Sequence, residues 1–293
     1  MNKFSERMKL TPVRTVLQTD SMDDGLRNRL WNVLCFYYWE SLAGSQGFHL
    51  SRPHGSAEIE ALATLVTRIW HLFLKIPFDS MPDYWPNCYV AIQQFYRQYE
   101  WYEVYNFIEF CANNHPDTAR CEQFVSSCNQ VLEQELAGYR FVGGRLVPIT
   151  SETEIAAVEE ALEVPLGSVQ KHLQCSLDLL SNREKPDYRN CVKEAISAIE
   201  AMCKLVTGSN KVTLGDALNR IERESDMHLH KALKGAFQKL YGYVSDSPIR
   251  HALNLEDDPD LGQEDAKFFL VACSAFINYL LAKSVKAGIK LDL

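Results

Sequence analysis

The chain has 293 residues, of which 46% are hydrophobic and 23% are charged, a composition typical of a soluble globular protein and not of a disordered one. This length suffices for two domains of ordinary size. The formal net charge of −8 excludes an overall basic field that would attract nucleic acid. Residues 160–293 carry 17 Lys and Arg against 19 Asp and Glu, so only −2 of that charge lies there. Any RNA contact is therefore expected in this C-terminal part, and as a local patch.

The cysteines and the chain start indicate the compartment. Nine cysteines are scattered singly without a C-x-x-C pair, which favours a reducing cytoplasm over a disulfide framework or a zinc site. The opening MNKFSERMK lacks the apolar segment of a signal peptide. The longest uncharged run, 268–282, is too short to span a bilayer and is typical of a buried core helix. We predict a cytoplasmic protein that makes no membrane contact.

The first half of the chain shows helical periodicity, with apolar residues recurring at steps of three and four. The helices predicted from this pattern are 24–43, 57–76, 86–114 and 118–138. The third is rich in aromatic residues, a stripe that is more often core packing than a platform for stacking bases. Two short apolar runs about a Gly-Gly pair then predict a small β-hairpin over 139–149.

The second half is predicted to be helical as well. A capping-box pattern at Ser151 and Glu154 restarts the helical periodicity after the hairpin. The helices predicted further on are 165–181, 187–206, 213–224, 229–242, 247–253 and 262–286. We therefore expect an all-α fold of two helical domains, 1–150 and 151–293, with one small hairpin between them.

Several enzyme classes lack their usual sequence support. The chain contains no G-x-x-x-x-G-K-[ST], no G-x-G-x-x-G and no G-x-S-x-G. His228 and His230 lie two residues apart without a third ligand at metal spacing. We expect no cofactor and no metal ion.

The predicted helix 187–206 carries candidate polar residues beside its apolar stripe. Arg189 and Lys193 lie along one flank of the stripe, where a neighbouring helix or ligand can reach them. Asn190 and Glu194, one turn apart, lie roughly opposite it. A solvated charged flank is the usual reading of such a pattern, and Arg189 stands out because it lies at the edge of the stripe in the first turn.

A second candidate is the stretch SDSPIRHAL, residues 245–253. Ser247 suits the N-cap of a helix and Pro248 its first position, which places Arg250 and His251 in the first turn. The unpaired N–H groups there attract anions such as phosphate. The alternative is that Asp246 neutralises Arg250 and that His251 packs in a core.

The chain resembles a known pair of domains in three separated blocks. The opening FSERMKLTPVRTVLQTDSMDDGLRNRLWNVL is similar to the AbiJ-type N-terminal domain of bacterial abortive-infection proteins. The run PDYRNCVKEAISAIEAMCKLVTG, with LYGYVSDSPIRHAL and DAKFFLVACSAFINYLLAK, resembles the HEPN domain often joined to it. This resemblance implies a phage-defence role and a HEPN-like helical bundle at 151–293. It also implies a homodimer, a phage or host protein as trigger, and RNA as substrate.

Active HEPN domains cut RNA without metal through an Arg-polar-x(3–5)-His motif. Arg189 with Asn190 matches its start, but Glu194, Ala195 and Ile196 stand where the histidine should follow. Arg250 with His251 matches it too, but residues 255–257 are Leu, Glu and Asp.

Two functions therefore stay open. The first is a metal-independent endoribonuclease, in which His251 transfers protons while Arg250, Arg189 and Lys193 bind phosphate and Asn190 supports catalysis. The second is a non-catalytic helical module that binds a protein, RNA or nucleotide in defence signalling.

Overall fold

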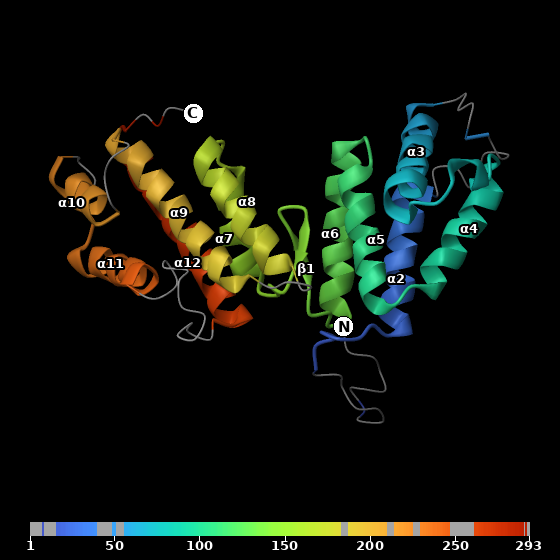
Figure 1. Cartoon of the computed structure of the whole chain (residues 1–293), viewed down its shortest axis with the longest axis horizontal. Helices are drawn as coiled ribbons and strands as arrows, with labels where there is room; N and C mark the ends of the chain where they lie inside the picture. Colours follow the sequence, from blue (N-terminus) through green and yellow to red (C-terminus); the bar gives the residue numbers. More distant parts are fainter. Residues whose placement is uncertain are drawn as a thin grey trace. The chain divides into compact units, whose positions relative to one another are not determined.

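The computed structural model describes residues 8, 16–39, 49–50, 56–182, 187–209, 214–224, 229–246, 261–289 and 291. The protein is mostly helical, with 75% helix and a small two-stranded antiparallel hairpin, so the expected all-α fold with one hairpin is confirmed. It divides into two compact units, unit 1 (Met1–Leu146) and unit 2 (Val147–Leu293). Figure 1 labels the α-helices of both units and strand β1.

Unit 1 consists of helices followed in the chain by the hairpin (Figure 1). Its helical elements are α2 (Asp24–Leu34), η1 (Cys35–Trp39), α3 (Ala57–Arg68), η3 (Ile69–Leu74), η4 (Phe78–Ser80), α4 (Trp85–Gln98), α5 (Trp101–Asn114) and α6 (Thr118–Gln134). Caps explain where two of them begin: the carboxylate of Asp23 accepts from the Leu26 N–H, and that of Asp117 accepts from the Arg120 N–H.

The predicted helix 86–114 is wrong, because the chain forms two helices, α4 and α5, that are interrupted at Tyr99 and Glu100. Glu100 caps α5 in a capping box, with its own N–H donated to the Glu103 carboxylate at 2.7 Å. The aromatic pattern continues across this break, so apolar periodicity alone does not reveal it. The predicted helix 57–76 ends earlier than expected, because η3 ends at Leu74 and Lys75 takes a left-handed conformation. The predicted end of helix 24–43 lies outside the described residues. Both η1 and η3 are wound as π-helix.

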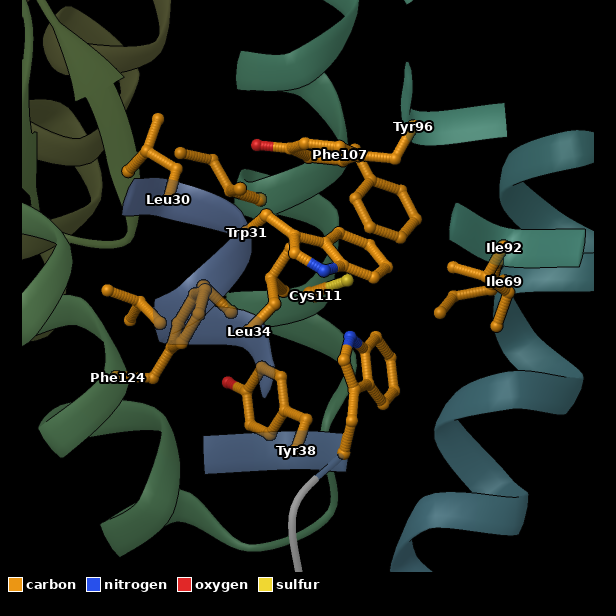
Figure 2. Packing of buried hydrophobic residues seen from close by; sticks show 14 of the residues in the cluster. Leu30, Trp31, Leu34, Tyr38, Ile69, Ile92, Tyr96, Phe107, Cys111 and Phe124 are labelled. Atoms are coloured by element: carbon orange, nitrogen blue, oxygen red, sulfur yellow. The ribbon is translucent and has the colours of Figure 1, made fainter. Parts of the chain in front are cut away.

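The core of unit 1 is built from aromatic rings, as the aromatic stripe predicts. Figure 2 shows these rings packed around α2. The ring centroids of Trp31 and Tyr96 lie 4.8 Å apart, and those of Tyr38 and Phe124 lie 4.6 Å apart. Phe124 is fully buried. Rings at these distances add directional contacts to the burial of apolar area.

The hairpin consists of β1 (Arg140–Val142) and β2 (Arg145–Val147), inside the predicted range. Its turn uses Gly143 and Gly144 at φ values of +53° and +81°, a conformation that glycine adopts without strain. Asn129 on α6 holds β1 by two hydrogen bonds to Phe141: the backbone N–H donates to Asn129 Oδ1 at 2.7 Å, and Asn129 Nδ2 donates to the carbonyl at 3.0 Å.

Unit 2 is a helical bundle. Its elements are α7 (Glu152–Glu163), α8 (Gly167–Ser181), α9 (Tyr188–Thr207), α10 (Leu214–Glu224), α11 (Lys231–Asp246) and α12 (Gln263–Lys286). Helix α9 lies at its centre, packed against α8, α12 and α10 (Figure 1). The predicted end of one helix at residue 242 is wrong, because α11 continues to Asp246. The predicted helix 247–253 lies outside the described residues.

Helix α12 contains the apolar run noted in the sequence. By length and composition it is long and apolar enough to cross a membrane, and 44% of its most apolar window is buried inside the protein. Its buried face, which includes Phe269, Cys273 and Ile277, packs against α9 and α7. The helix therefore has a packing role within unit 2.

Candidate functional site

The first turn of α9 holds two of the predicted site residues. The carboxylate of Asp187 caps the helix by accepting the Asn190 backbone N–H at 3.0 Å. The Asn190 side chain also donates to Asp187, from Nδ2 to Oδ2 at 2.6 Å. Asn190 therefore helps to fix the start of α9, and its amide is engaged with the cap rather than turned to an external ligand.

Arg189 and Lys193 follow the helix around its surface. Arg189 is half-buried and Lys193 is exposed. At 100° per residue, Arg189 lies about 140° around the axis from Glu194, so the two project from different flanks of α9. Arg189 and Glu194 are therefore not neighbours on the surface of α9.

The Glu194 side chain, at the position where the motif histidine is expected, is nevertheless paired with a histidine of the neighbouring helix. The Glu194 carboxylate lies 2.6 Å from Nδ1 of His172, which projects from the neighbouring helix α8. Their side chains are 25% and 37% exposed, so solvent and small groups reach both. The antiparallel packing of α8 on α9 brings them together, as it does Ser176 and Cys191 one turn further along, where the Ser176 hydroxyl donates to the Cys191 carbonyl at 2.9 Å.

Sequence reasoning missed His172. The two residues are 22 positions apart, and their meeting depends on the register between two helices, which periodicity does not give. The signal available in the sequence is that His172 lies at the border of the apolar stripe formed by Val169, Leu173 and Leu177.

An exposed thiol lies on α8 one turn beyond His172. Loss of hydration, and next the negative charges of Glu194 and Asp178, raise the pKa of Cys175, while the positive charge of Lys171 lowers it. A raised pKa keeps the thiol protonated near neutral pH, and the thiolate is the nucleophile. Cys175 is therefore poorly suited to nucleophilic catalysis.

The second predicted site, at residues 245–253, lies almost wholly outside the described residues. Arg250 and His251 lie outside the described residues, so their distance from Arg189 and Lys193 is not part of the structure. Within the described part of the chain, no group of three or more His, Cys, Asp or Glu side chains is placed to hold a metal ion.

Unit 1 contains a separate hollow of about 300 Å³ between α2 and α6. It is lined by Arg29, Asn32, Val33, Phe36, Tyr37, Ser127 and Val131. The Tyr37 and Ser127 hydroxyls lie 2.8 Å apart, and Arg29 pairs with Glu135 at 2.6 Å. Because that pair neutralises the guanidinium, the hollow presents no unbalanced charge to an anionic ligand.

The comparisons with known proteins identify the first part of this helical protein. The family model AbiJ N-terminal domain 4 matches residues 2–164, more than half of the chain. The chain therefore belongs to the AbiJ N-terminal domain 4 family, which points to an abortive-infection protein of phage defence. The matched range covers unit 1 and continues through α7 of unit 2. Neither the curated proteins nor the solved structures contain a match.

Proposed function

We propose that this abortive-infection protein acts as a metal-independent endoribonuclease of the HEPN type, with its N-terminal domain sensing infection. Membership of the AbiJ N-terminal domain 4 family carries the defence role. The nuclease step draws support from unit 2, a helical bundle in which an Arg-Asn pair stands in the first turn of the central helix α9. In this proposal Arg189, Lys193 and Arg250 bind phosphate, and His251 transfers protons.

Helix α11 supports a local RNA contact in unit 2. Its sequence holds Lys231, Lys234 and Lys239 against Asp246 as its single acid, in a protein whose net charge is −8. Lys231 and Lys239 are exposed. Positive side chains spaced along one helix are the usual means of tracking a phosphate backbone. In the sequence, Arg250 stands four residues beyond the end of this helix.

The test is expression of the wild type beside His251→Ala, with growth and total RNA integrity followed during phage challenge. We expect the wild type to arrest growth and fragment RNA, and His251→Ala to do neither at an unchanged melting temperature. His230→Ala is the matched control, because His230 is an exposed histidine of the same unit. The nuclease proposal is contradicted if the His251→Ala protein is less stable than the wild type while the RNA of its cells shows the same state as the RNA of wild-type cells.

A second candidate function is a non-catalytic module that binds a partner in defence signalling. The engagement of Asn190 with the Asp187 cap favours it, since that amide has a structural role. Under this alternative, the wild type protects against phage while RNA stays intact, and Arg189→Ala reduces partner binding without any change in RNA cleavage.

Assembly is part of the same proposal. HEPN-type sites are often completed by a twofold partner, and an isologous dimer would bring two copies of Arg250 together. Light scattering at micromolar concentration tests this, and a monomer under those conditions contradicts it. The cytoplasmic location and the absence of membrane contact remain predictions.

A further inference from the structure

The pair formed by His172 and Glu194 has the geometry of a general base held by a carboxylate. A carboxylate offers only acceptor oxygens, so the 2.6 Å contact requires that Nδ1 of His172 carries the proton. In the neutral imidazole, Nε2 is then the acceptor nitrogen. The pair thus fixes both the tautomer and the ring orientation, as the carboxylate does in hydrolase triads.

Access and charge around the pair suit an anionic substrate. His172 is 37% exposed, and each member of the pair is preceded in sequence by an exposed lysine, Lys171 on α8 and Lys193 on α9. The negative charge of Glu194 is balanced by an imidazolium when His172 takes up a proton. Two flexible cations from different helices can approach a phosphate beside the imidazole.

We propose that His172 is the catalytic base of the RNA cleavage and that Glu194 is its positioning residue. This inference rests on the proposed endoribonuclease function, and it gives His172 the proton transfer that the proposal above gives His251. Glu194 stands five residues after Arg189, where the motif histidine is expected, and the structure supplies an imidazole at that place from α8. The carboxylate on α9 therefore stands at the position expected for the histidine, and the imidazole is provided by α8.

The chemical step is transesterification within the RNA. Nε2 of His172 takes the proton of a ribose 2′-OH, and the 2′-oxygen forms a bond to the adjacent phosphorus. The P–O5′ bond breaks, and the leaving 5′-oxygen takes a proton from water. The products are a 2′,3′-cyclic phosphate and a 5′-hydroxyl end, and the imidazolium returns its proton to the hydroxide formed. Lys171 and Lys193 stabilise the charge that develops on the phosphate.

The experiment uses the purified full-length protein and a short fluorescein-labelled single-stranded RNA. His172→Asn removes the base, and Glu194→Gln removes the carboxylate at nearly constant size. His49→Asn is the matched control, because His49 Nδ1 pairs with Asp83 at 2.7 Å in unit 1 and has no part in the proposed chemistry. Cleavage rate, melting temperature and the Kd for a 2′-O-methyl version of the RNA are measured for each protein.

We expect His172→Asn to lower the cleavage rate about 100-fold or more, the usual contribution of general base catalysis. Glu194→Gln should lower it less, because glutamine still offers an oxygen to Nδ1. The Kd should stay within about threefold of the wild type, since the base acts after binding. The control His49→Asn should cleave at the wild-type rate.

Failure of this inference differs from failure of the proposed function. If His172→Asn and Glu194→Gln cleave at the wild-type rate while His251→Ala does not cleave, the inference is overturned and the nuclease proposal stands. If the wild type cleaves RNA neither as the purified protein nor in phage-challenged cells, both are overturned. If it cleaves RNA only in challenged cells, the same variants are compared there. Should His172→Asn fail to fold, the folded Glu194→Gln decides: full activity overturns the inference, and a reduced rate at unchanged Kd supports it.

Discussion

The two units bury their helices with different side chains. Unit 1 fills its interior with rings, such as Trp31, Tyr38 and Phe124, and ties its hairpin to the helices through side chains. Unit 2 buries mostly aliphatic and small residues along α9, including Val192, Ile199 and Met202. Rings have few rotatable bonds and fixed contact geometries, so they define one arrangement strongly. Aliphatic helix faces pack closely as well, and leave polar flanks such as that of Glu194 at the surface.

The largest expected effect on stability comes from a substitution in the aromatic core of unit 1. Phe124→Ala removes a fully buried ring that lies 4.6 Å from Tyr38 and 6.3 Å from Tyr37. We expect the free energy of unfolding to fall by about 3–5 kcal/mol, because the transfer term and the cavity term add. Urea denaturation followed by circular dichroism measures it. Phe36→Ala is the control, since Phe36 is 66% exposed, and its effect should be far smaller.

The sequence predicts much of this architecture. Polar caps such as Asp187 and the Gly143–Gly144 turn are local signals, so the start of α9 and the hairpin are confirmed where they were expected. The break between α4 and α5 escaped because the aromatic pattern runs through Glu100. The pairing of His172 with Glu194 escaped for a different reason: it depends on how two helices pack, which local sequence does not encode.

The next effect tests the attachment of the hairpin in unit 1. Asn129→Ala removes both hydrogen bonds to the Phe141 backbone, at 2.7 and 3.0 Å, and leaves its N–H and carbonyl without these partners. We expect a loss of about 1–3 kcal/mol in the free energy of unfolding. Asn129→Asp sharpens the test, because it keeps the acceptor and loses the donor. If Asn129→Ala unfolds at the wild-type denaturant concentration, this attachment does not stabilise unit 1.

A pH effect follows from His115 in unit 1. Burial, the largest cause, lowers the pKa of His115 below its usual 6.5, and its ring stacks on Tyr38 with centroids 4.7 Å apart. Between the lowered pKa and 6.5 the unfolded chain binds more protons than the folded one, so stability rises with pH in that window and falls as the pH drops. His115→Gln should flatten this slope in urea denaturations from pH 5 to pH 7. An unchanged slope contradicts the assignment to His115.

The smallest expected effect on stability concerns the thiols. It compares buried thiols of unit 1 with the exposed thiol of Cys175 in unit 2. In unit 1, burial raises the pKa of Cys88 to about 12 and places those of Cys111 and Cys128 well above the ordinary value. In unit 2, Cys175 is exposed and its pKa is also raised. Because thiolate is the reactive form, access and charge state both decide the rate of alkylation.

We therefore expect iodoacetamide to label Cys175 before the buried thiols, at a rate below that of free cysteine at neutral pH and increasing as the pH rises. Mass spectrometry of the native protein locates the label. Cys175→Ser should remove this early label and change the free energy of unfolding by less than about 0.5 kcal/mol, as expected for a surface substitution. Early labelling of Cys111 or Cys128 instead would mean that the aromatic core of unit 1 opens often enough to expose these thiols to the reagent. That result would contradict the view that the rings of unit 1 hold one tight arrangement.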